Sequence, residues 1–263
     1  MKRILSAAEI ILIIVVAVIP LFPNLPYRLN SYLSWEGAYR IMQGQIPFKD
    51  FGMPVGYMYW VIPSIFFKLF GAQMITLIKA QLFINLLAGF AFRSILRNLQ
   101  VAQVIRFAGI LVFCLSYSLP NYWPWYNHTV IVYELIALAF LISFLTGKPS
   151  KWQYLWLFLS GVFVFFSFFT KQDGGALAFL LCLALLAYDA IIEKRWVPIT
   201  VFVGAVVATG LIMILPLLPY GFGYWFNHGQ PPHSSRISIT DILTEFLISS
   251  QWLKFYLALI AII

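Results

Sequence analysis

The residues best placed to do chemistry lie in one short segment, residues 34–54, with the sequence SWEGAYRIMQGQIPFKDFGMP. It contains two carboxylates, Glu36 and Asp50, and two cations, Arg40 and Lys49. A positioned carboxylate can take a proton or bind a metal, and cations beside it can hold an anionic head group. Glu36 and Arg40 are four residues apart, so they would face each other on a helix. A solvated surface ion pair is the other interpretation, and the residues alone leave both open.

A second group of candidates lies in the polar and aromatic loop NYWPWYNHT, residues 121–129. Tryptophan rings stacked on sugar faces would make this loop a sugar or acceptor site. An aromatic belt at the membrane interface has the same composition, and it is the more common case. The candidates for sugar or acceptor contact here are Trp123, Trp125, Tyr126, Asn127 and His128, of which His128 is expected to be an interfacial hydrogen-bonding residue.

Two further charged residues lie within or beside apolar segments. Glu134 is predicted about one and a half turns inside a span, where a carboxylate is costly and therefore indicates a function. Its side chain would face a cavity that it shares with the loop candidates above, or it would form a structural ion pair with a basic group such as Lys79. Lys171 occupies a tight turn between two predicted spans, where a solvated side chain is the ordinary interpretation.

The elements that must position these residues follow from the composition. Hydrophobic residues make up 62% of the 263 residues and charged residues only 10%, whereas soluble domains carry roughly 25% charged residues. The apolar runs are too long for barrel strands, so we expect an all-α, polytopic transmembrane bundle. The net charge of +8 is scattered between the runs, which indicates membrane topology and not nucleic-acid binding.

The sequence predicts about eight spans in one transmembrane domain, residues 1–263. A short helix is expected over residues 36–41. Residues 56–70 form an apolar run too short to span easily, with Pro63 in its middle, so we expect a helix lying at the interface. The predicted spans are 5–22, 73–92, 106–119, 129–146, 153–170, 174–191, 198–218 and 242–263.

Basic residues predict the orientation of these spans. Pairs at Lys2/Arg3, Arg93/Arg97, Lys148/Lys151 and Lys194/Arg195 would share one side, which the positive-inside rule makes cytoplasmic. The outer side would hold the first outer loop, residues 23–72, and a loop over 219–241 that could act as a lid. In the latter, His228 and His233 have no close carboxylate or cysteine partner, which argues against zinc. The last apolar run reaches Ile263 without a polar flank, so we expect a longer natural chain.

The first outer loop resembles a known motif, E-G-x-x-R-x-x-x-G-x-x-P-[FY]-[KR]-D-F-x-x-P followed by K-L-F-G. This motif is found in bacterial membrane glycosyltransferases of the GT-C superfamily, related to protein O-mannosyltransferases and aminoarabinose transferases. A weaker resemblance is F-x-T-K-Q-x-G at residues 168–174, and the span order is similar over about residues 1–220. The matching loop residues are Glu36, Gly37, Arg40, Gly44, Pro47, Phe48, Lys49, Asp50, Phe51, Pro54 and Lys68-Leu69-Phe70-Gly71.

The resemblance implies transfer of a sugar from a polyprenyl-phosphate carrier, at the outer face, to a hydroxyl of a glycan, lipid or protein. An acidic residue of the first outer loop would be the base, and cations would hold the departing phosphate. Where the family has an Asp-Glu pair this chain has Trp35-Glu36, so the base would be Glu36, with Asp50 as the second carboxylate. Arg40, Lys49 and Lys171 would bind the phosphate. A divalent cation is a candidate cofactor, although no residue spacing here indicates a metal site.

Two other functions remain open at this point. A transporter or lipid flippase would use Glu134 and Lys79 as an ion pathway, but the spans lack the paired Gly/Pro breaks that build sites at the bilayer midplane. A non-catalytic membrane protein is favoured by the missing aspartate and by the abrupt end at Ile263.

Overall fold

The all-helical prediction is confirmed over the part of the chain that the structure describes. The computed structural model describes residues 2–22, 29–52, 55–147, 150–228, 238–244 and 248, and no strand occurs among them. Among these residues a single bridged pair, Pro47 and Phe51, closes a turn in the segment between α2 and α3, the predicted first outer loop.

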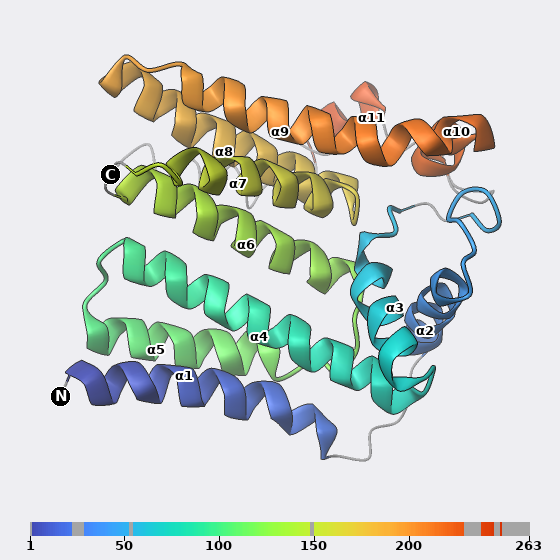
Figure 1. Ribbon diagram of the computed structural model, residues 1–263, viewed down its shortest axis with the longest axis horizontal. Helices are drawn as coiled ribbons and strands as arrows, with labels where there is room; N and C mark the ends of the chain where they lie inside the picture. The colour runs from blue at the N-terminus through green and yellow to red at the C-terminus, as the bar shows by residue number, and fades with distance from the viewer. Residues whose placement is uncertain are drawn as a thin grey trace.

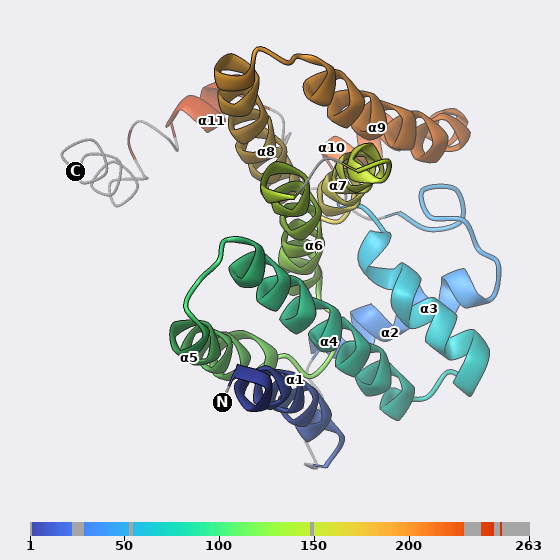
Figure 2. The same cartoon turned by 60° about the vertical axis from the view of Figure 1, so that its left-hand side comes forward.

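Long helices lying side by side make up most of the described structure, and they run alternately in opposite directions (Figure 1). α1, α4 and α5 form one group, and α6 to α9 form a second group that packs on the first through α4 and α6 (Figure 2). The long helices are α1 (Lys2–Val18), α4 (Met74–Asn98), α5 (Gln103–Phe113), α6 (Tyr126–Thr146), α7 (Gln153–Phe168), α8 (Gln172–Glu193) and α9 (Val197–Ile214). Tighter or wider turns extend three of them: η1 (Ile19–Leu21), η2 (Cys114–Ser118, a π turn) and η3 (Leu215–Tyr220).

Five helical segments among the described residues are long and apolar enough to cross a membrane, as in an integral membrane protein. They are Ile4–Leu21, Met74–Asn98, Tyr126–Thr146, Gln172–Glu193 and Val197–Tyr220. Two further predicted spans form shorter apolar helices, Gln103–Ser118 and Gln153–Phe168. The eighth, 242–263, lies almost wholly outside the described residues, so the count of eight is not confirmed.

Two short helices lie together across one end of the bundle, and we name this end the loop-one end (Figure 1). They are α2 (Leu29–Met42), which is longer than the helix predicted over 36–41, and α3 (Met58–Phe70). α3 corresponds to the predicted interfacial helix and ends at Gly71, whose φ of 83° favours glycine. Its depth in a membrane stays a prediction. Two more short helices, α10 (Phe222–Asn227) and α11 (Ile239–Thr244), follow α9.

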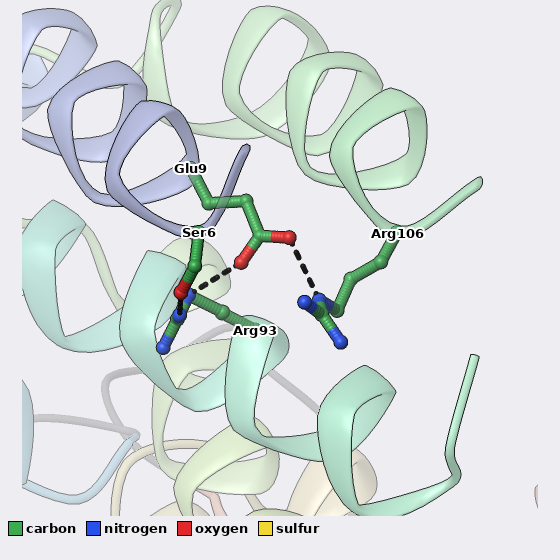
Figure 3. Close-up of polar contacts among 4 residues, drawn as sticks. All are labelled: Ser6, Glu9, Arg93 and Arg106. Carbon is green, nitrogen blue, oxygen red and sulfur yellow. Dashed lines mark hydrogen bonds and ion pairs between the residues drawn. The ribbon is translucent and has the colours of Figure 1, made fainter. Parts of the chain in front are cut away.

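In the half of the bundle away from the loop-one end, a buried carboxylate joins three helices (Figure 3). Glu9 on α1 has a fully buried side chain, and its two oxygens accept hydrogen bonds from Arg93 on α4 and Arg106 on α5, each at 2.8 Å. Arg93 also donates to Ser6 Oγ at 2.8 Å. The prediction that Arg93 lies in a connection between spans is wrong, because α4 continues to Asn98 and carries the guanidinium into this contact.

Close helix packing in the second group depends on small residues. A Cβ placed on Gly161 of α7 would lie 2.7 Å from the Cβ of Ala205 and 2.7 Å from the carbonyl oxygen of Phe202, both on α9. The absent side chain therefore lets the two backbones approach, as small residues do where membrane helices meet. Gly204, next to Ala205, has no neighbour within 4 Å of a Cβ in the same position.

We expect Gly161→Ala to destabilise the protein by roughly 1–3 kcal/mol, because the added methyl group overpacks a rigid backbone contact. Gly204→Ala is the matched control: it adds the same methyl group to a helix in open space and should be neutral, or stabilising by up to about 1 kcal/mol. Thermal unfolding in detergent measures both. Equal melting temperatures for the two variants would contradict the proposed close packing of α7 on α9.

Candidate functional site

The helix α2 presents the first pair of candidate residues on its exposed face. Its opposite face is buried: Ser34 is fully buried and donates its hydroxyl to the carbonyl oxygen of Pro124. Gly37 packs directly on the indole of Trp60 in α3, where a Cβ would come within 1.9 Å of the ring. These two contacts fix the rotation of α2, and Glu36 therefore projects away from the bundle with 54% of its side chain exposed.

The predicted contact between Glu36 and Arg40 forms. Arg40 donates from Nη2 to Glu36 Oε1 at 2.7 Å and from Nε to the same oxygen at 3.0 Å. Its Nη1 reaches Gln45 Oε1 at 3.1 Å, and the guanidinium lies 5.5 Å from the centre of the Phe51 ring. Arg40 thus orients the carboxylate with three of its five N–H donors, one of which bonds Gln45.

The second carboxylate of the loop stabilises a turn. Asp50 Oδ2 accepts a hydrogen bond from the backbone N–H of Ile46 at 2.7 Å, and the backbone N–H of Phe48 donates to the carbonyl oxygen of Phe51 at 2.7 Å. Lys49 extends from the same turn, with its Nζ 5.4 Å from the centre of the Tyr220 ring at the end of η3. Asp50 is exposed but already has this structural partner, so Glu36 is the better placed of the two carboxylates.

This turn is anchored by Phe48, for which the sequence predicted no such role. Phe48 has a φ of 66°, which costs a non-glycine residue about 1–2 kcal/mol, yet its side chain is only 4% exposed. Its ring contacts Phe222 with centroids 5.0 Å apart, and Tyr57 and Phe169 at 6.4 Å each. Burial of the ring offsets the backbone strain and holds the turn on the end of the bundle.

The loop and the turn that carries Lys171 are also in direct backbone contact. The N–H of Met58 donates to the carbonyl oxygen of Phe169 at 3.3 Å. A Cβ on Gly56 would lie 1.7 Å from the same oxygen, so only glycine fits at that point. This contact sets the position of the first outer loop relative to Lys171, two residues after Phe169.

Three other candidates line one cavity between α6 and α8. It has a volume of about 500 Å³ and is lined by Asn127, Glu134, Lys171 and Asp173 together with apolar residues. Glu134 accepts a hydrogen bond from Ser167 Oγ at 3.3 Å, and Lys171 forms an ion pair with Asp173 at 3.0 Å. The cavity therefore combines a partly buried carboxylate with a cation that is itself paired.

The suggested partner of Glu134, Lys79, is engaged elsewhere. Its Nζ lies 5.6 Å from the centre of the Phe70 ring, at the junction of α3 and α4. The buried hydrogen-bond partner of Glu134 is Ser167 on α7, a residue that sequence spacing gave no reason to choose.

The aromatic candidates of residues 121–129 mainly fasten the loop to its neighbours. Trp123 packs with Ala38 and Phe67, Trp125 lies 4.3 Å from Tyr126 between ring centroids, and Tyr126 lies 6.0 Å from Tyr59. Burial raises the pKa of the Tyr59 phenol, and the neighbouring Tyr126 raises it further, so the phenol stays neutral. Sugar stacking by these rings stays a prediction.

The backbone of His128 accepts a hydrogen bond from the hydroxyl of Tyr117. The only one of the five candidates in this loop that lines the cavity between α6 and α8 is Asn127.

The candidate residues thus form two groups at the loop-one end. The exposed group, Glu36, Arg40, Lys49 and Asp50, does not line the cavity between α6 and α8, and the aromatic cluster around Phe48 and Phe169 lies between it and the cavity group. Within the described residues no three His, Cys, Asp or Glu side chains gather as metal ligands. Pro54 of the motif, and His233 with residues 229–237 of the predicted lid, lie outside the described residues.

The chain matches no family model, no curated protein and no solved structure. The resemblance to membrane glycosyltransferases therefore rests on the motif residues themselves.

We expect Phe48→Ala to loosen the turn of residues 46–51, because removal of a buried phenylalanine ring costs roughly 3–5 kcal/mol. Amide hydrogen exchange should become at least about tenfold faster at position 48 and at Asp50, whose N–H groups both close the turn. Ile46→Ala is the control, since the Ile46 side chain is 40% exposed and the backbone N–H that bonds Asp50 is kept. Unchanged exchange in Phe48→Ala would show that the ring does not anchor the loop.

Proposed function

We propose that this protein transfers a sugar from a polyprenyl-phosphate donor to an acceptor hydroxyl, with Glu36 as the general base. In this proposal the loop-one end faces the outside of a bacterial plasma membrane, the N-terminus is cytoplasmic, and about eight spans cross the bilayer. The protein's long apolar helices, and the placement of the motif residues at one end of them, support this arrangement.

The observation that carries the proposal is the presentation of Glu36. It is the motif carboxylate that lies on a helix held rigidly by Ser34 and Gly37, it is exposed, and Arg40 orients it from one side. A base of this kind needs a fixed position and access to the acceptor proton. Asp50 fits less well because the turn uses its carboxylate.

The chemical step balances with these groups alone. The acceptor oxygen forms a bond to the anomeric carbon of the sugar while the bond from that carbon to the phosphate oxygen breaks. Glu36 takes the proton of the acceptor hydroxyl, and the lipid phosphate leaves with the bonding electron pair. Cations near the leaving oxygen stabilise the charge that develops there, and Lys49 and Lys171 project from two neighbouring turns of the loop-one end.

An apolar cavity supports a lipid-linked donor. It has a volume of about 750 Å³ and lies between α3, α4, α6 and α7, lined by Met58, Leu87, Tyr133, Phe140 and Trp156 among other apolar residues. It contacts α3 at the loop-one end and Trp156 in the second turn of α7, toward the opposite end. A prenyl chain placed there would bring its phosphate to the end of the bundle that carries the cations.

We expect Glu36→Gln to slow sugar transfer by about 10²–10⁴-fold, the usual contribution of a general base. The protein is reconstituted in proteoliposomes with a panel of polyprenyl-phosphate-linked hexoses, and release of free polyprenyl phosphate is followed by chromatography. Glutamine keeps an oxygen for Arg40, so the helix should be unaffected.

Two variants control this experiment. Glu193→Gln removes an exposed carboxylate at the far end of α8 and should leave the rate unchanged. Asp50→Asn retains an oxygen for the N–H of Ile46 and should also retain activity. Transfer at the wild-type rate in Glu36→Gln would exclude Glu36 as the base. If the wild-type protein releases polyprenyl phosphate from none of the donors in the panel, the proposed activity is contradicted.

A second function, transport of a small polar solute, is favoured by one observation. Glu134 faces a cavity of about 500 Å³ within the bundle, together with Lys171 and Asp173. If transport is the function, Glu134→Gln should abolish proton-coupled solute uptake in proteoliposomes, and Glu36→Gln should leave it intact. The reverse sensitivity would support glycosyl transfer.

A further inference from the structure

The cluster around Glu9 carries an unbalanced charge. One carboxylate is shared by the guanidinium groups of Arg93 and Arg106, so the three side chains together carry a net charge of +1. Both arginines are largely buried, with 14% and 12% of their side chains exposed. A charge of this kind is expensive in a low-dielectric setting unless another ion balances it.

The two arginines also have unused hydrogen-bond donors. Each guanidinium offers five N–H donors. Arg106 donates only from Nε to a protein acceptor among the described residues, and Arg93 donates from Nε and Nη2. Figure 3 draws one contact from Arg106 to Glu9, made by Nε, and none from the two terminal nitrogens of Arg106. The planar donors of a guanidinium group match the oxygen atoms of a phosphate group, and the two guanidinium groups here flank one carboxylate.

The surroundings of the cluster suit a lipid. Arg106 follows Val104 and Ile105, each 66% exposed, and Ile4 near Ser6 is 73% exposed. The cluster lies in the half of the bundle away from the loop-one end, with Arg106 in the first turn of α5 and Arg93 five residues before the end of α4. Basic pockets between membrane helices bind anionic head groups, with acyl chains along the adjoining apolar faces.

We propose that Arg106 and Arg93 bind the phosphate of an anionic ligand, and that a membrane lipid with a net negative head group supplies it. The site is independent of the proposed glycosyl transfer and lies in the other half of the bundle. Its chemistry is that of a phosphate oxygen accepting charge-assisted hydrogen bonds from the Arg106 and Arg93 donors that Glu9 and Ser6 leave unused.

The test compares Arg106→Gln with the wild-type full chain by native mass spectrometry in detergent, with phosphatidylglycerol and phosphatidylcholine as probes. We expect wild type to retain phosphatidylglycerol preferentially, and Arg106→Gln to bind it about fivefold more weakly, which corresponds to about 1 kcal/mol per basic residue. Lys151→Gln is the matched control, because it removes one charge from an exposed residue in the turn before α7. Equal binding in wild type, Arg106→Gln and Lys151→Gln would overturn the site.

Two further measurements separate the remaining outcomes. Titration with inorganic phosphate distinguishes a lipid head group from a free phosphate as the ligand. If Arg106→Gln weakens the binding of inorganic phosphate but not of phosphatidylglycerol, the site binds a soluble phosphate. Arg106→Lys keeps a cation beside Glu9 but replaces the guanidinium fork with a single ammonium group, which gives a second result if Arg106→Gln does not fold. It should also bind phosphatidylglycerol more weakly than the wild type, and unchanged binding in Arg106→Lys would contradict the proposal.

Discussion

The contact on which the rest of the bundle depends is the buried carboxylate of Glu9 between Arg93 and Arg106. Three charged groups from α1, α4 and α5 can share a low-dielectric interior only in one relative position, because a shift of any helix would leave a buried charge without its partner. Such a loss costs about 3–5 kcal/mol. The cluster therefore specifies how the first two long helices and their neighbour align, and α4 carries that alignment into the second group through its packing on α6.

α4 has a second polar anchor nearer the loop-one end. Gln81 donates to Asn85, and Asn85 donates to the carbonyl oxygens of Ser118 and Asn121, where the π turn η2 leaves the helical path. All of these groups are buried, so each hydrogen bond has to form for the helix to remain in place. With one anchor toward each end, α4 acts as a fixed support for α3, which is joined to it by a short turn at Gly71.

Local spacing predicted local contacts, whereas contacts between distant segments could not be predicted. The pair of Glu36 and Arg40 and most helix positions follow from the interval between residues or from runs of apolar side chains. Glu9 comes from a different helix than both arginines, and counting charges for topology treated Arg93 as a loop residue. The anchoring role of Phe48 could not be predicted either, because it depends on distant segments. Its strained backbone is stable only because Phe169 and Phe222, far along the chain, bury its ring.

The separation of the candidate residues into two groups has one structural cause. Gly56 and Met58 approach the carbonyl oxygen of Phe169 so closely that the first outer loop cannot slide toward the cavity between α6 and α8. Within these two groups Glu36 pairs with Arg40, and Lys171 pairs with Asp173. A ligand that engages both groups must therefore extend across the aromatic cluster of Phe48 and Phe169. The proposed donor, a sugar phosphate on a long prenyl chain, would be an extended ligand of that kind, and the apolar cavity between α4 and α6 would take its prenyl part.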